Sequence, residues 1–292
     1  MKQEMLILAG PASPRTAEHL AELTGAQLVK VEYKRFPDGE SYIRLPVSVE
    51  GEEVVVVQTT YPEQDKRLVE LLLMIETAKD LGAKSVTTVA PYLAYARQDR
   101  QFRDGEALSV KTVLRLIEAA GATKFVTVDI HKKESLSWLS IEGINVTAVE
   151  LLSEHLKKQK LSNPVVIAPD VGAKWRAEKA AEILRGETVV LEKHRDRITG
   201  EIVTKGVEVD LRGRDVVIID DLISTGGTIA NAAKIAKKKG AGKVYVACTH
   251  ALLIGAAMEK MVKAGVDEVI ATDTVPSPVS VVGVAPAIAK VL

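Results

Sequence analysis

The sequence predicts an α/β fold made of two similar domains, each built on a doubly wound parallel sheet. Short valine- and isoleucine-rich runs alternate with helical patterns through most of the 292 residues. Several of these runs, such as Val54–Val57 and Val216–Ile219, are continuously apolar, which is typical of strands buried on both faces. The alternation recurs in both halves, which favours two sheets over one very large sheet. We expect domains at 1–145 and 146–292.

The first domain is expected to alternate strands and helices from its start. The expected strands are Met5–Ala9, Gln27–Lys34, Glu53–Gln58, Ser85–Ala90 and Lys124–Asp129. The expected helices are Arg15–Leu23, Lys66–Leu81 and Ala107–Ala119. Gly82 and Gly121 follow two of these helices, and glycine is favoured just beyond the last helical turn.

The second domain repeats the alternation. The expected strands are Pro164–Ala168, Thr188–Glu192, Asp215–Asp220, Lys243–Cys248 and Glu268–Thr272. The expected helices are Ala173–Leu184, Thr228–Lys239 and Ala256–Lys263. Pro276 and Pro278 indicate a loop over Val275–Val282, and Ala285–Leu292 is expected to be a final short helix.

Composition excludes several classes of protein. Lys+Arg and Asp+Glu are both 39, so the formal net charge is zero, which argues against a nucleic-acid partner. The single cysteine, Cys248, excludes an intramolecular disulfide framework and fits a reducing cytosol. Because no apolar run approaches the ~20 residues that span a bilayer, and the apolar run at Met5–Ala9 is too short for a signal peptide, we expect a cytoplasmic protein without a membrane partner.

The strongest functional signal is the segment Val216–Thr228. An apolar strand leads into Asp220 and Asp221, then into a turn rich in hydroxyl groups and glycine before a helix. Ligands of open α/β sheets collect at the carboxyl ends of strands, and a helix start with free N–H groups binds phosphate. The carboxylates suit vicinal sugar hydroxyls, so the segment predicts a sugar-phosphate site, although a plain acidic turn with a helix cap is the alternative. The expected phosphate-binding residues are Ser224, Thr225, Gly226, Gly227 and Thr228.

Four further segments follow expected strands. Phe36–Glu40 contains a Pro-Asp-Gly turn, and Tyr92–Arg100 contains Arg97 and Gln98, which suit a polyphosphate or a base. His131 ends one strand, and Asp170 ends another, where a carboxylate suits a hard cation such as Mg²⁺. The first three have structural alternatives: a simple turn, an exposed charged loop, and a histidine that only supports the fold.

The segment Leu191–Arg197 is dense in charge as it leaves its strand. Such density usually marks a solvated face. On an extended segment, however, Lys193 and Arg195 point the same way because they are two residues apart. Two converging cations would stabilise a transferring phosphoryl group. We expect the following residues, through Ile198–Lys205, to form a flap with a turn at Thr199–Gly200.

Taken in this order, these segments resemble those of the ribose-phosphate diphosphokinases, the synthetases of phosphoribosyl diphosphate (PRPP). The Asp220–Thr228 loop alone also resembles the PRPP loop of type I phosphoribosyltransferases, and the resemblance implies that fold for both domains. The resemblance covers essentially the whole chain. The modest length of the chain is similar to that of the archaeal members of the family. Two departures are small: Ser224–Thr225 replaces the common Asp-Thr, and Val171–Lys174 replaces a glycine-rich stretch. Neither removes a hydroxyl, amide or carboxylate that the chemistry needs.

The resemblance implies an enzyme of nucleotide biosynthesis that transfers the diphosphoryl group of ATP to the anomeric hydroxyl of ribose 5-phosphate, with Mg²⁺. Lys193 and Arg195 would be catalytic, with Arg195 also at the sugar substrate. Asp220 and Asp221 would hold ribose hydroxyls, and the 224–228 loop the 5-phosphate. His131 and Asp170 would serve the metal–nucleotide complex. The residues implied for ATP are Phe36, Asp38, Gly39, Glu40, Arg97 and Gln98.

In the resembled family the turn at Asp38–Glu40 comes from a neighbouring subunit, which implies a homo-oligomer with shared active sites. Two alternatives remain open: a phosphoribosyltransferase that consumes PRPP, and a non-catalytic regulatory homologue. The first generally lacks the Phe36–Glu40 and Arg97–Gln98 elements, and the second would have lost part of its cation pair or acidic site.

Overall fold

A computed structural model describes residues 5–195, 202–205 and 209–292. The chain divides into two units: unit 1 is Met1–Thr147 with Gly283–Leu292, and unit 2 is Ala148–Val282. Each unit holds one six-stranded sheet and one separate two-stranded sheet. The predicted α/β class with parallel sheets is confirmed.

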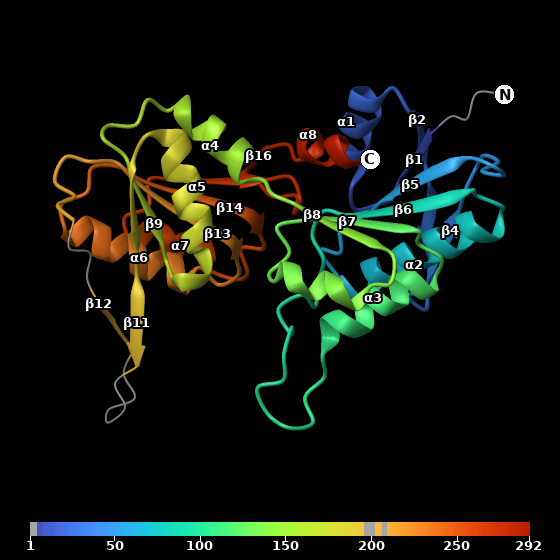
Figure 1. Ribbon diagram of the computed structural model, residues 1–292, viewed down its shortest axis with the longest axis horizontal. Helices are drawn as coiled ribbons and strands as arrows, with labels where there is room; N and C mark the ends of the chain where they lie inside the picture. The colour runs from blue at the N-terminus through green and yellow to red at the C-terminus, as the bar shows by residue number, and fades with distance from the viewer. Residues whose placement is uncertain (1–4, 196–201, 206–208) are drawn as a thin grey trace. The chain divides into compact units, whose positions relative to one another are not determined.

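The main sheet of unit 1 is entirely parallel, with strand order β2-β1-β5-β6-β7-β8. Its strands are β1 (Met5–Ala9), β2 (Gln27–Lys30), β5 (Glu53–Val57), β6 (Ser85–Ala90), β7 (Lys124–Val128) and β8 (Glu142–Val146). The helical segments of the unit are α1 (Pro14–Thr24), α2 (Gln64–Asp80), α3 (Ser109–Ala119), η1 (Lys133–Trp138), α8 (Ala285–Ile288) and η3 (Ala289–Val291). Figure 1 shows α2 and α3 on one face of this sheet, with α1 and α8 on the other.

The core of unit 1 follows from the two-residue period of its strands. Leu6 and Leu8 face the cluster that includes Leu71 of α2 and Leu114 of α3. Ile7 lies between them, is fully buried and therefore faces the α1 side. Because both faces are covered, nearly every position of β1 and β5 is apolar, which is why these strands could be recognised in the sequence.

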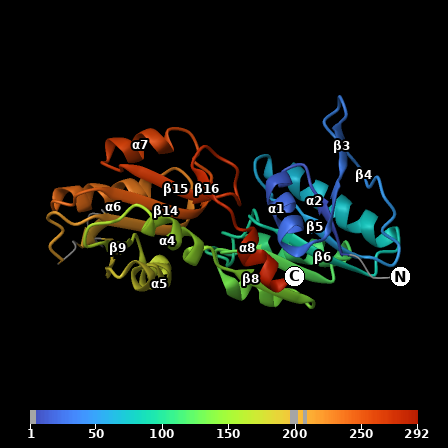
Figure 2. The ribbon, with the colours of Figure 1, turned by 90° about the horizontal axis from the view of Figure 1, so that it is seen from above.

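The expected strand Gln27–Lys34 is instead two strands. β2 stays in the main sheet, while β3 (Glu32–Arg35) leaves it and pairs in antiparallel fashion with β4 (Ser41–Arg44). The division falls at Val31, whose N–H donates to the carbonyl oxygen of Ala9 at the edge of the sheet. Figure 2 shows the β3–β4 hairpin extending away from the sheet of unit 1.

The main sheet of unit 2 is also parallel, in the order β10-β9-β13-β14-β15-β16. Its strands are β9 (Val165–Ala168), β10 (Glu187–Val190), β13 (Val216–Ile223), β14 (Val244–Ala251), β15 (Glu268–Thr272) and β16 (Ser280–Val282). The helical segments are α4 (Val149–Lys157), η2 (Val171–Ala173), α5 (Lys174–Leu184), α6 (Gly227–Lys238) and α7 (Ala257–Lys263). A hairpin of β11 (Glu192–Arg195) and β12 (Ile202–Lys205) completes the unit. In Figure 2, α6 and α7 lie on one side of the sheet and α4 and α5 on the other.

The two units repeat one topology. In each, the first strand of the main sheet lies between the second and the third, and the remaining strands follow in order. In each, a two-stranded hairpin is inserted after the second strand of the main sheet. The ladder registers make the following residue pairs equivalent: Leu6 and Val165, Gln27 and Glu187, and Val54 and Val216.

Several sequence expectations need correction. The expected second domain, 146–292, includes a tail that belongs to unit 1, where α8 packs against α1 and Val291 accepts a hydrogen bond from Lys124. The segment Val275–Val282, expected to be a loop, contains the short edge strand β16. The strand begins after Pro276 and Pro278 and pairs with β15. The helix α4 and the edge strand β8 were not expected. Among the residues described, no helix is both long and apolar enough to cross a membrane.

Candidate functional site

The acidic pair of unit 2 lies near the carboxyl end of β13, which continues to Ile223 rather than ending at Asp220. Adjacent strand residues point to opposite faces, so the two carboxylates are not equivalent. Asp221 is 7% exposed and faces α5, whereas Asp220 is half-buried. Burial raises the pKa of Asp220 well above its usual value, and the negative charges of Asp221 and Asp170 raise it further. The charges of Asp170 and Asp221 therefore both influence the protonation of Asp220.

The loop after β13 forms an open cradle at the start of α6. Gly226 has φ +71°, and a Cβ there would lie 3.1 Å from the carbonyl oxygen of Ala257, so only glycine suits this position. Thr225 and Gly227 are exposed, while Ser224 and Thr228 are half-buried. The Nζ of Lys260 donates to the carbonyl of Thr225 at 2.9 Å and braces the loop from behind. These hydroxyl groups and helix-start N–H groups fit an anionic phosphate.

Asp170 lies directly after β9, at the same edge of the sheet. Its Oδ1 accepts a hydrogen bond from the N–H of Ala173 at 3.3 Å and so caps the short η2 turn. The capping bond orients the carboxylate, and the negative charge of Asp170 contributes to the raised pKa of Asp220.

Sequence reasoning missed Arg176, a buried residue of α5. Its Nη2 lies 3.5 Å from Oδ2 of Asp221, and both side chains are almost fully buried. A signal was present in the sequence: Arg176 falls on the apolar face defined by Ala177, Ala180, Ala181 and Leu184. A charged residue on such a face needs a partner of opposite charge.

Lys193 and Arg195 lie on β11, in the hairpin that follows β10. Their backbones pair with Thr204 and Ile202 of β12. The expected flap is therefore a β-hairpin where the backbone is described, but its turn at Thr199–Gly200 lies outside the described residues.

In unit 1, Phe36, Asp38, Gly39 and Glu40 form the tip of the β3–β4 hairpin. The Oδ1 of Asp38 accepts the N–H of Glu40 at 3.1 Å, and Gly39 has φ +100°. The Nε of Arg35 donates to the carbonyl of Gly39 at 3.3 Å. Both carboxylates of the tip and the ring of Phe36 are exposed, so they are available to a ligand or to another protein chain.

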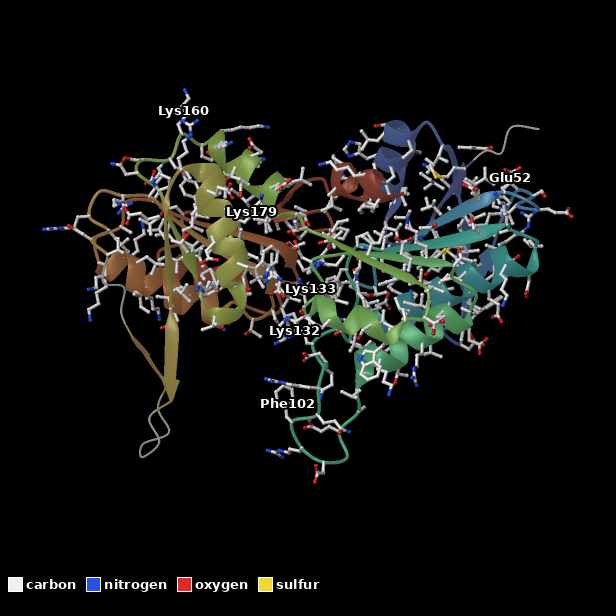
Figure 3. All side chains as sticks on the ribbon, viewed as in Figure 1. Glu52, Phe102, Lys132, Lys133, Lys160 and Lys179 are labelled. Carbon is white, nitrogen blue, oxygen red and sulfur yellow. The ribbon has the colours of Figure 1, made fainter. Side chains whose placement is uncertain are left out.

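Arg97 and Gln98 lie in the long loop after β6. Arg97 is exposed, whereas Gln98 is held within the loop by a bond from its Nε2 to the carbonyl of Arg100 at 3.3 Å. Figure 3 shows Phe102 on the part of this loop that extends away from the sheet. The loop is shaped by Glu106, whose Oε2 accepts the N–H of Phe102 at 2.7 Å. His131 is exposed and follows β7 at the same carboxyl edge of unit 1.

A buried polar network holds the hairpin of unit 1, and sequence reasoning missed it as well. Glu70 of α2 is fully buried. Its Oε1 accepts from Ser41 at 2.9 Å, directly after Glu40, and its Oε2 accepts from Gln58 at 3.1 Å and from Arg67 at 2.8 Å. Glu70 thus joins the hairpin to the carboxyl end of β5.

The predicted site residues therefore form two sets, one in each unit. Part of each set follows the carboxyl ends of the main sheet, whereas the tip at Phe36–Glu40 and the strand β11 belong to separate hairpins. The set in unit 2 combines carboxylates, a phosphate cradle and the β11 strand. The set in unit 1 combines an exposed acidic tip, an arginine loop and His131. Unit 2 has the chemistry for a phosphorylated sugar, and unit 1 has exposed groups for a charged ligand.

Comparisons with known proteins identify similar sequences along nearly the whole chain. Residues 5–121 match the N-terminal domain of ribose phosphate pyrophosphokinase, and residues 203–287 match the phosphoribosyl synthetase-associated domain. A ribose-phosphate pyrophosphokinase of Sulfurisphaera tokodaii is 46% identical, over 98% of this chain and 99% of that protein. One from Methanothermobacter thermautotrophicus is also 46% identical, over 98% and 99%. The crystal structure of phosphoribosylpyrophosphate synthetase from Mycobacterium smegmatis has a TM-score of 0.88 at 30% identity, covering 99% of this chain and 97% of that one.

The Glu70 network generates a prediction about stability. Arg67→Met leaves the fully buried carboxylate of Glu70 without its cation, which should lower the free energy of unfolding by about 3–5 kcal/mol. The double variant Arg67→Met/Glu70→Met should lose less than the sum of the two single losses, because it leaves no uncompensated charge. Urea unfolding measures all four proteins. Additive losses would show that the pair is not coupled.

Proposed function

The chain belongs to the ribose-phosphate pyrophosphokinase family, and we propose that it transfers the diphosphoryl group of ATP to ribose 5-phosphate, giving PRPP and AMP. The observation that carries this proposal is the site of unit 2, where an acidic pair suited to ribose hydroxyls precedes a cradle suited to the 5-phosphate. The β3–β4 tip and the Arg97 loop, which phosphoribosyltransferases generally lack, favour the synthetase.

The reaction forms one P–O bond and breaks another. The anomeric oxygen of ribose 5-phosphate attacks the β-phosphorus of ATP and loses its proton. The bond from the β-phosphorus to the oxygen bridging it to the α-phosphorus breaks, and AMP leaves with that electron pair. Negative charge grows on the bridging oxygen and the transferred group. Positioning and electrostatic stabilisation therefore supply most of the catalysis.

Each group of residues has a role in this scheme. Lys193 stabilises the transferring group, and Arg195 assists it at the sugar substrate. Asp220 and Asp221 accept the ribose hydroxyls, and Ser224, Thr225, Gly226, Gly227 and Thr228 bind the 5-phosphate. The residues proposed for ATP are Phe36, Asp38, Gly39, Glu40, Arg97 and Gln98.

The acidic residues of unit 2 fit Mg²⁺ held together with substrate oxygens. Asp170 is the proposed protein ligand, and His131 serves the metal–nucleotide complex. Within the described part of the chain, no three His, Cys, Asp or Glu side chains are grouped closely enough to hold a metal alone. Magnesium commonly takes only one or two carboxylates and completes its shell with phosphates and water, so this donor set fits. When bound, Mg²⁺ supplies charge neutralisation on the diphosphoryl oxygens.

The proposal includes a homo-oligomer in the cytoplasm. The Asp38–Glu40 tip is exposed on a hairpin of its own, which supports a role at the nucleotide site of a neighbouring subunit. The single cysteine, Cys248, is buried in β14, which supports a reducing compartment.

The proposed reaction is tested by ³¹P NMR. Protein mixed with ATP, Mg²⁺ and ribose 5-phosphate should produce PRPP and AMP in equal amounts, without ADP. A parallel sample receives PRPP and a nucleobase. Turnover only in that second sample would identify a phosphoribosyltransferase, and turnover in neither would identify a regulatory homologue.

The role of Lys193 gives a kinetic prediction. Lys193→Ala should lower kcat by at least ~10²-fold, as the loss of one main electrostatic stabiliser does, with a far smaller change in KM for ATP. Lys263→Ala, which removes an exposed lysine of α7, is the control and should leave both constants unchanged. Near-normal turnover of Lys193→Ala would contradict the assignment.

The shared site predicts complementation between two inactive variants. Lys193→Ala and Glu40→Ala should each be nearly inactive alone. After unfolding, mixing and reassembly, part of the activity should return, because some interfaces then combine an intact tip with an intact β11. Each variant carried through the same treatment alone is the control. If the mixture stays inactive while refolded wild type recovers, the nucleotide site is built from one chain.

A further inference from the structure

Arg176 is a buried cation at the ligand-binding edge of unit 2. Only 5% of the residue is exposed, although it carries a full positive charge. Removing such a charge from water is costly unless the surrounding protein compensates it. The compensation here comes from Asp221, whose Oδ2 lies 3.5 Å from Nη2 and whose side chain is almost as buried.

The guanidinium also reaches the turn that carries Asp170. Its Nη1 donates to the carbonyl of Gly172 at 3.3 Å, two residues beyond Asp170 in the capped η2 turn. Its Cζ lies over the ring of Trp175, 4.7 Å from the ring centroid. One side chain therefore joins the end of β9 to the acidic pair on β13.

The positive charge of Arg176 also offsets negative charge at the carboxyl edge of the sheet. Asp221 and Asp170 are negative charges that both disfavour ionisation of Asp220 and raise its pKa, so negative charge is concentrated at this edge. A buried cation in contact with one of these carboxylates offsets part of that charge. Within the described residues, the Nε of Arg176 has no hydrogen-bond partner. The polar contacts of the guanidinium are therefore made by Nη1 and Nη2.

Comparison of the two units shows that the Arg176–Asp221 pair is not part of the topology that the units share. The helices α1 and α5 have equal length and follow the first strand of their units. Both bury their third, fourth, seventh and eighth residues, and α5 also buries its eleventh, Leu184. Arg176 is the third residue of α5, and its equivalent in α1 is Thr16. Counting on along the chain from the equivalent residues Val54 and Val216, the position of Asp221 corresponds to Thr59. The topology is thus built with neutral, buried threonines at both positions in unit 1.

We propose that Arg176 is a positioning residue for the sugar site: its guanidinium fixes the Asp221 carboxylate that accepts a ribose hydroxyl and ties it to the Asp170 turn. The inference rests on the proposed function. Arginine suits the task better than lysine, because its planar fork reaches a carboxylate and a carbonyl at once, whereas an ammonium acts as a point charge. Unit 1 lacks both charges at the equivalent positions and needs no such tie.

The test measures sugar binding and turnover separately. Arg176→Met keeps much of the side-chain volume and removes the charge. We expect its affinity for ribose 5-phosphate, measured by calorimetry without ATP, to fall about 10- to 100-fold, by analogy with the loss of a group that orients a metal-ligating side chain. KM for ribose 5-phosphate should rise in parallel, and KM for ATP should change far less, because the proposed ATP residues do not include Asp221.

The matched control is Arg214→Met. Arg214 also joins a carboxylate and a carbonyl, through Glu187 at 3.0 Å and Asn163 at 2.9 Å, but it precedes β13 at the opposite edge of the same sheet. We expect no change in either KM. Low, non-denaturing guanidinium should restore part of the sugar affinity to Arg176→Ala and none to Asp221→Asn. A role limited to folding would show no such rescue.

The internal repeat suggests a variant that controls for effects on folding. The double variant Arg176→Thr/Asp221→Thr carries at both positions the residues that unit 1 carries, so it should fold while losing sugar affinity. Arg176→Lys should bind the sugar with an affinity between those of wild type and Arg176→Met. Unchanged sugar affinity in folded Arg176→Met or Arg176→Lys would overturn the proposal, as would an equal loss of ATP and sugar binding. If wild type binds ribose 5-phosphate but forms no PRPP, the proposed reaction fails while this inference is still tested by calorimetry.

Discussion

The parallel direction of the strands is the constraint on which the rest of this structure depends. In each unit, six strands run the same way, so every strand must be followed by a crossover that returns the chain to the start of the sheet. All carboxyl ends therefore meet at one edge. The crossover helices cover both faces, which makes the strands apolar and leaves the ends of the strands for polar side chains, with ligand sites expected at the carboxyl edge. The predicted site residues of the main sheets lie where this geometry places them.

Charge at that edge has to be compensated by the fold itself. Glu70 in unit 1 and Arg176 in unit 2 are both buried, each beside a partner of opposite charge, and each joins segments from different strands. Glu70 does so through Ser41 and Gln58, and Arg176 through Asp221 and the carbonyl of Gly172. Pairs of this kind add little net stability, but removing one partner is costly, so they tie a loop to one arrangement. Glu70 connects the β3–β4 hairpin, whose tip is proposed to bind ATP, to α2. Arg176 connects the turn of Asp170, the proposed metal ligand, to α5.

The internal repeat shows how one topology acquires two tasks. The hairpins β3–β4 and β11–β12 occupy equivalent places after the second strand, and the residues aligned with Lys193 and Arg195 are Tyr33 and Arg35. In unit 1 this hairpin displays an acidic tip, and in unit 2 its first strand carries the proposed catalytic cations. Where unit 2 has Asp220 and Asp221, unit 1 has the neutral Gln58 and Thr59. The scaffold is common, and the charges at its carboxyl edge differ between the two units.

The sequence by itself determined the α/β class, most central strands and the loop from Asp220 to Thr228, because buried parallel strands are continuously apolar and a glycine-rich helix start is a local pattern. Short or half-buried edge strands such as β8 and β16 lack that pattern. Only the tertiary structure divided Gln27–Lys34 at Val31, since a hydrogen bond across strands decides which half stays in the sheet. It also returned the C-terminal tail to unit 1, through packing of α8 on α1. The tie between Arg176 and Asp221 joins residues 45 positions apart, and only the crossover between β9 and β13 brings them into contact.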